Sequence, residues 1–118
     1  MDLFKAVHKN DYELVKKLIE EGADVNAKSY YGDTALMCAS AEGKKEICEL
    51  LIANGADVNA KNNEGGTALI YAAEEGNKEI CELLIDNGAE VERYEIEKMA
   101  KNGWFDLCKK VIRKKAFA

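Results

Sequence analysis

The chain contains the same 33-residue unit twice in succession. Residues 29–61 and 62–94 agree at 19 of 33 positions when the second stretch is laid over the first. Each copy is too short to bury its own apolar face, so neighbouring copies must stack and share a core. A fixed period of this size therefore predicts a solenoid, in which each unit contacts only the units beside it.

Each copy predicts two short helices joined by a tight turn. Thr34 and Thr67 stand where a helix N-cap would, with a side-chain oxygen for the free N–H groups of the first turn. Gly43 and Gly76 end this first helix, since glycine tolerates the backbone of a tight turn. The second helix, EICELLI in both copies, carries an apolar stripe wide enough to require cover on more than one side. An Asn-Gly pair and a glycine-containing polar stretch then predict an extended arm.

This order of β-turn arm and two antiparallel helices resembles the ankyrin repeat. The family pattern TPLHxAAxxGHxxxVxxLLxxGADVNA is matched by TALMCASAEGKKEICELLIANGADVNA and by TALIYAAEEGNKEICELLIDNGAEVER. The resemblance implies an all-α ankyrin-repeat solenoid of four stacked helix-turn-helix units, with β-turn arms between them.

Two positions depart from the family pattern. Ala35 and Ala68 replace its proline, and Met37 and Ile70 replace its histidine. The hydrogen bond that this histidine makes to the threonine hydroxyl cannot form here. We therefore expect weaker polar tethering between repeats, with packing carrying more of the stability.

We expect a single domain over the whole chain. The first 28 residues are a divergent copy of the unit, and the last unit follows after 27 residues instead of 33, so six arm residues are missing there. Both end units carry lysine where the inner units have leucine, which favours terminal caps with a solvent-facing side. The expected units are an N-terminal capping repeat (1–28), two full repeats (29–61 and 62–93) and a C-terminal capping repeat without an arm (94–118). We interpret them as a complete array rather than a fragment.

Composition favours a globular protein of the cytoplasm. The 118 residues are 47% hydrophobic and 33% charged, with a formal net charge of −5, as is ordinary for a soluble domain. The longest apolar runs are far too short to span a membrane, and residues 1–7 leave no room for a signal-peptide core. We expect a cytoplasmic protein with no membrane partner.

Charge is distributed unevenly along the chain. Residues 1–93 hold 10 basic and 19 acidic side chains, whereas residues 94–118 hold 7 and 3. The acidic body argues against nucleic acid as the main ligand, because phosphate binding needs a basic stripe over the contact face. The basic tail lies at a predicted helix C-terminus, where cations are favourable. It is interpreted as a solubilising cap, with a contact for an acidic partner as the alternative.

The sequence shows no catalytic, metal-binding or cofactor motif. His8 is the only histidine, the four cysteines lack CxxC spacing, and the nucleotide-binding glycine patterns and GxSxG are absent. Cys48, Cys81 and Cys108 occupy one equivalent position in successive second helices, which predicts reduced thiols in an apolar seam. We expect no enzyme activity and no cofactor. A thiol redox sensor is the alternative, and it would need an exposed, reactive thiolate.

The remaining candidate site is a surface. In ankyrin repeats, partner contacts typically come from the arm tips and the exposed side of the first helix, and the resemblance implies the same positions here. The first arm tip holds Tyr30, Tyr31 and Asp33, the second holds Asn63, Glu64 and Gly66, and the first-helix ridge holds His8, Lys9, Ala41, Glu42, Glu74, Glu75, Lys101 and Asn102. The ridge is acidic in the middle and basic at its ends, so it would suit a basic or mixed-charge partner segment.

The aromatic residues each have two interpretations. Tyr30 and Tyr31 predict a binding hot spot, since adjacent aromatics on a turn have little core to join; alternatively, one packs on the neighbouring arm. Tyr71 is expected to pack between repeats with its hydroxyl at the rim. Trp104 and Phe105 are expected to cover the end of the stack, with a partner site or self-association patch as the alternative.

These observations together predict a non-catalytic, monomeric protein–protein interaction module. The alternatives are the thiol redox sensor and a structural module that self-associates through its C-terminal cap. In the second case Trp104, Phe105 and Phe117 would form the apolar contact.

Overall fold

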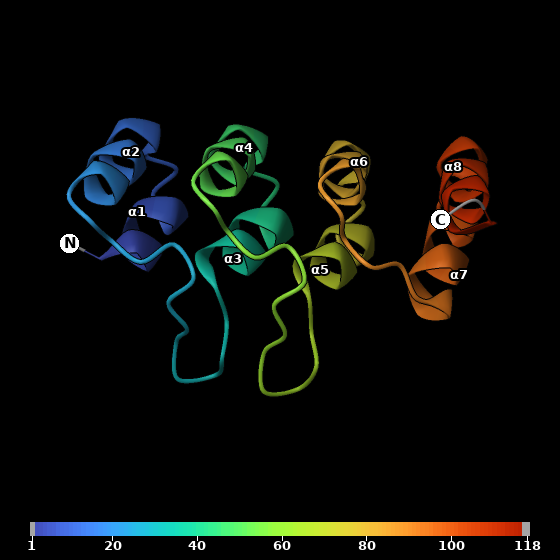
Figure 1. Ribbon diagram of the computed structural model, residues 1–118, viewed down its shortest axis with the longest axis horizontal. Coiled ribbons are helices and arrows are strands. Elements are labelled where there is room, and N and C mark those ends of the chain that lie inside the picture. The colour runs from blue at the N-terminus through green and yellow to red at the C-terminus, as the bar shows by residue number, and fades with distance from the viewer. Residues whose placement is uncertain (1, 117–118) are drawn as a thin grey trace.

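A computed structural model describes residues 2–116 of the chain, which form eight helices and no strand. The helices are α1 Leu3–His8, α2 Tyr12–Glu20, α3 Ala35–Ala41, α4 Lys45–Ala53, α5 Ala68–Glu74, α6 Lys78–Asp86, α7 Arg93–Lys101 and α8 Phe105–Ala116. They stack as four antiparallel pairs along one axis, with α1, α3, α5 and α7 in one row and α2, α4, α6 and α8 in the other (Figure 1). The predicted all-α solenoid is confirmed, with overall extents of 41 × 25 × 24 Å.

Side-chain caps define where the first helices begin. The Thr34 hydroxyl accepts a hydrogen bond from the Met37 amide at 3.3 Å, and the Thr67 hydroxyl accepts one from the Ile70 amide at 3.2 Å. Both threonines have extended backbone, as an N-cap requires. Their predicted role as caps is confirmed.

One apolar seam runs between the two rows of helices and through all four pairs. Leu51 and Leu84 are both completely buried in it. The other large side chains with under 2% exposure include Leu36, Ile47, Leu69 and Met99. These residues come from α3 to α7, and helices pack both within a pair, as α3 on α4, and between pairs, as α3 on α5, so neighbouring pairs share one core.

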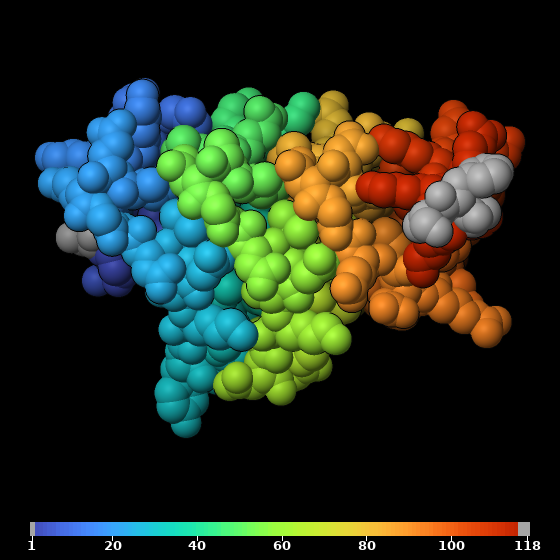
Figure 2. All heavy atoms as spheres, in the orientation of Figure 1, coloured from blue at the N-terminus to red at the C-terminus, as the bar shows by residue number. Residues whose placement is uncertain are grey.

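Two arms project from the side of the first helices (Figures 1 and 2). Their tips are β-turns, closed by hydrogen bonds from the Gly32 amide to the Ser29 carbonyl and from the Gly65 amide to the Asn62 carbonyl. Gly32 also has a positive φ of 81° and lies against the second arm, where an added Cβ would be 2.7 Å from Asn63 Oδ1. Residues 87–92 connect α6 to α7 directly, and no arm projects there.

Asparagine side chains tie successive units together along the arms. The Asn26 amide donates to the Gly55 carbonyl at 3.0 Å, and its oxygen accepts from the Asp57 amide at 2.7 Å. One repeat later, Asn59 makes the same two bonds, to the Gly88 carbonyl and from the Glu90 amide. The expectation of weak polar tethering overlooked these asparagines, because it considered only the missing histidine.

The helices of residues 2–116 are also limited in length and apolar character. None combines enough of both to cross a lipid bilayer.

Candidate functional site

The first arm presents two tyrosine rings to solvent. Tyr30 is 91% exposed and Tyr31 is 70% exposed, so neither ring packs on the neighbouring arm. The rings contact each other edge to face, with centroids 5.4 Å apart and planes at 90°. Their backbone is held by the second arm, because Asn63 donates from its amide nitrogen to the Tyr31 carbonyl and from its side chain to the Tyr30 carbonyl. The pair is therefore an exposed aromatic feature on an anchored backbone.

The second arm has a mainly supporting role. Asn63, one of the predicted contact residues, uses both its backbone and side-chain N–H groups on the first arm. Gly66 lies under the Tyr71 hydroxyl, and a Cβ there would be only 2.7 Å from it. Of the predicted contact residues on this arm, only Glu64 is an exposed charged side chain.

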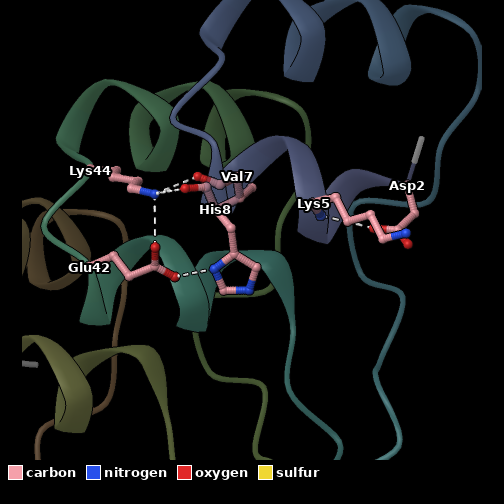
Figure 3. A network of polar contacts seen from close by, with 6 residues as sticks. All are labelled: Asp2, Lys5, Val7, His8, Glu42 and Lys44. Atoms are coloured by element: carbon pink, nitrogen blue, oxygen red, sulfur yellow. Dashed lines mark hydrogen bonds and ion pairs between the residues drawn. The ribbon is translucent and has the colours of Figure 1, made fainter.

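A polar network joins the first and second helix pairs at the start of the ridge (Figure 3). Glu42 pairs with His8 Nδ1 at 2.6 Å through one oxygen and with the Lys44 ammonium at 2.8 Å through the other. Lys44 also donates to the carbonyls of Val7 (2.6 Å) and His8 (2.9 Å) at the end of α1, where cations are favourable. Sequence reasoning placed His8 and Glu42 on a contact surface, and the structure shows that they also bind each other.

The rest of the ridge is partly paired as well. The Tyr94 hydroxyl donates to a Glu74 oxygen at 2.8 Å, and this bond to the carboxylate raises the pKa of Tyr94 because it favours the protonated phenol. Glu75, Lys9 and Lys101 are exposed, and none of the ion pairs within residues 2–116 includes them. These three are the ridge charges most available to a partner.

A groove of about 240 Å³ lies between α3 and α5, at the base of the first arm. It is lined by Asp33, Met37, Cys38, Ala41, Glu42 and Tyr71. Asp33 and Glu42 were predicted as contact residues, whereas Met37 and Cys38 were missed. Cys38 and Tyr71 are 33 residues apart and so occupy equivalent positions of adjacent units. This spacing is the sequence feature from which their shared interface could have been predicted.

The groove has a negative electrostatic character. Partial burial, together with the nearby Asp33 and Glu42 carboxylates, raises the pKa of the Cys38 thiol to about 11. The Lys44 ammonium acts on this pKa in the opposite direction but more weakly than either carboxylate. A negative thiolate is therefore disfavoured in the groove.

The predicted row of thiols lies in the core. Cys48 and Cys81 are completely buried and Cys108 is 8% exposed. Burial raises the pKa of Cys48 to about 11 and that of Cys81 to about 12. Such thiols carry almost no thiolate at neutral pH and are poor nucleophiles. Within the described part of the chain, no three metal-ligating side chains gather at one point.

The end of the stack differs from the prediction at one residue. Trp104 is half-buried and packs against the core, as expected. Phe105 is 61% exposed, so the prediction that it covers the end of the stack is wrong. It is the first residue of α8 and shares an exposed face with Ile112 one heptad later, which is 55% exposed. Phe117 lies outside the described residues.

Two cations of the basic tail bind α6. Lys110 forms an ion pair with Asp86, which raises the Lys110 pKa, and Lys114 donates to the Ile85 carbonyl at 3.1 Å. These contacts attach α8 to the preceding pair. The acidic-partner alternative for the tail would have to use the other cations of α8.

Comparison with known proteins identifies the repeat directly. The family model for ankyrin repeats, in three copies, matches residues 3–95. A comparison with curated proteins gave no match. The family match runs from the first residue of α1 into the first turn of α7 and so covers well over half of the 118 residues. The chain therefore belongs to the ankyrin-repeat family.

Proposed function

We propose that this protein is a non-catalytic module of the cytoplasm that binds a partner protein through its arm tips and its concave first-helix surface. Ankyrin repeats are generally protein-interaction modules. The observation that supports the proposal for this chain is the Tyr30–Tyr31 pair, whose rings are mostly exposed and whose backbone carbonyls accept hydrogen bonds from Asn63.

A partner that covers the Tyr30–Tyr31 pair would gain binding free energy at a reduced entropic cost. An exposed aromatic pair loses solvent contact when a partner covers it, and tyrosine is enriched among residues that dominate binding energy. The edge-to-face contact and the anchored backbone reduce the freedom that these rings lose on binding. The first arm is therefore the proposed anchor of the interface.

The exposed charges favour one kind of partner. Glu64 and Glu75 are exposed acidic groups on the second arm and the ridge, and Lys9 and Lys101 are exposed cations toward the two ends. A partner with a basic or mixed-charge segment would complement this order of charges. Because these side chains are exposed, we expect them to affect the association rate and its salt dependence more than the final affinity.

The test is affinity capture from the source cell followed by titration of the captured partner. The Tyr30→Ala/Tyr31→Ala variant should keep the thermal midpoint, because both rings are exposed, and should weaken binding by roughly tenfold or more. Tyr12→Ala is the matched control, since Tyr12 is also exposed but lies on α2 in the opposite row. An unchanged affinity of the double variant would remove the first arm from the interface.

The properties of the thiols argue against the redox alternative. Cys48 and Cys81 are buried with raised pKa values, and even the half-buried Cys38 has a pKa raised to about 11. We expect thiol labelling of the native protein to find no fast cysteine at neutral pH. One rapidly labelled thiol would reopen the sensor hypothesis.

A further inference from the structure

The groove between α3 and α5 has an anchored wall at one end. The Asn62 side-chain nitrogen donates to Asp33 Oδ1 at 2.9 Å and to the Tyr71 hydroxyl oxygen at 2.6 Å. The Asn62 oxygen is held in turn by the amides of Glu64 and Gly66 at 3.0 and 2.7 Å. One amide therefore fixes a carboxylate and a phenol ring beside each other, and neither must reorganise when a ligand arrives.

The floor of the groove is largely apolar. Asp33 and Glu42 flank α3 at its two ends, and Met37, Cys38 and Ala41 lie on the helix between them. The seven residues of α3 correspond to about 10 Å along the helix axis. The groove thus offers a carboxylate beside an aromatic ring at the arm end and a strip of carbon and sulfur atoms, and the Glu42 carboxylate at the far end is already paired with His8 and Lys44.

Resting on the proposed binding function, we propose that this groove receives an arginine side chain of the partner protein. The guanidinium lies between the Asp33 carboxylate and the Tyr71 ring, and its aliphatic stem lies along the half-buried Cys38 and Ala41. Asp33 has an oxygen left for this contact, because only its Oδ1 is used by Asn62.

Charge complementarity selects a cation over an apolar side chain. Asp33 and Glu42 are the charged residues that line the groove. Glu42 already pairs with His8 and Lys44, whereas Asp33 keeps one oxygen that Asn62 does not use, so Asp33 is the group that would bind the cation. Arginine suits the site better than lysine, because a planar guanidinium can pair with a carboxylate and stack on an aromatic face at once, whereas an ammonium is a compact, strongly hydrated charge. The groove also adjoins the exposed tyrosines, since Tyr31 and Asp33 belong to the same arm tip.

A fragment titration tests the site without the partner. The probe is N-acetyl-arginine methylamide, added to ¹⁵N-labelled protein at low ionic strength, and the readout is the amide signals of Met37, Cys38 and Ala41. We expect saturable shifts with a dissociation constant on the order of 10 mM. The citrulline analogue has nearly the same shape without the charge and should give no saturable shift, and the lysine analogue should bind several-fold more weakly.

Two variants distinguish binding in the groove from nonspecific attraction of the cation to an acidic protein. Asp33→Asn keeps an acceptor for Asn62 and should weaken arginine binding by about fivefold, as loss of a partly exposed ion pair would. Glu20→Gln removes one charge from the exposed side of α2 and should leave the binding constant unchanged. The proposal is overturned by an absence of saturable shifts, by equal binding of the citrulline or lysine analogue, or by an Asp33→Asn variant that binds like the wild type.

The two proposals can fail separately. A tyrosine variant that loses the partner, combined with no fragment binding, would leave an interaction module without an arginine site. Fragment binding in the groove, combined with an unaffected tyrosine variant, would remove the first arm but keep the arginine site.

Discussion

Truncation of one core leucine tests whether the stack shares a single seam. Leu51 on α4 is completely buried, and its neighbour Leu50 is only partly buried against the same core. Leu51→Ala leaves a cavity between helix pairs and should cost about 3 kcal/mol, within the usual 2–5 kcal/mol for a buried leucine. For a chain of this length the unfolding entropy is about 0.25 kcal/mol/K, so the thermal midpoint should fall by about 12 °C.

Leu50→Ala is the matched control for this measurement. It makes the same chemical change one position away on the same helix, so intrinsic helix propensity changes equally. Because Leu50 already contacts solvent, we expect a loss of only about 1 kcal/mol, or about 4 °C. Equal losses in the two variants, or a Leu51→Ala loss below about 1 kcal/mol, would refute the shared seam.

Two probes of urea unfolding show whether the damage spreads. Circular dichroism reports all helices, and Trp104 fluorescence reports the fourth helix pair, two pairs away from Leu51. If the solenoid unfolds as one unit, both midpoints should shift together in Leu51→Ala. A Trp104 midpoint that does not move would mean that the units unfold separately, as longer repeat arrays can.

Three further perturbations address other parts of the molecule. Burial holds the Cys81 pKa at about 12 against an ordinary value of 9.0, so the unfolded chain loses this proton first as pH rises. Between about pH 8 and about pH 10, the free energy of unfolding measured with urea should therefore fall by about 1.4 kcal/mol more in the wild type than in Cys81→Ala. An equal fall in the two proteins would contradict this. Asn59→Ala removes two inter-unit hydrogen bonds and should lower stability by about 1–2 kcal/mol in the same assay; a neutral variant would show that the tether adds nothing. Phe105→Ala should change the free energy of unfolding by less than about 0.5 kcal/mol. Light scattering should give the monomer mass for both the wild type and this variant at all concentrations. A mass that rises with concentration in the wild type but not in the variant would instead support self-association.

The fold could be predicted because its determinants are local or periodic. Thr34 and Thr67 cap helices through bonds to residues three positions away, and such bonds follow from residue type and spacing. Leu51 and Leu84 stand at the same position of successive units, so a core that serves one must serve both. Neither inference needed a distance between remote parts of the chain.

The candidate site could be predicted only in part, because its polar groups bind partners about one repeat away. Asn63 was expected to face a partner protein, but it holds the first arm through bonds that span 32 and 33 residues. Glu42 and His8 were both placed on the ridge, and their mutual contact depends on how α1 and α3 lie beside each other in one row. Residue type indicated that these side chains would be polar and outside the core, but it could not indicate how much of their bonding capacity the stack itself uses.

The ends of the first helices explain why the stack uses so many polar side chains. A helix of six or seven residues has about as many free carbonyls as paired ones, so each needs donors from outside. Lys44 supplies them to α1, Asn77 donates to the Ser40 carbonyl of α3, and Asn102 donates to the Ala73 carbonyl of α5. Lys44 and Asn77 are 33 residues apart and so occupy equivalent positions. In the last unit Trp104 stands at that position, and the donor Asn102 comes slightly earlier. The same backbone need is thus met in this chain by an ammonium and by amides from two different positions of the unit.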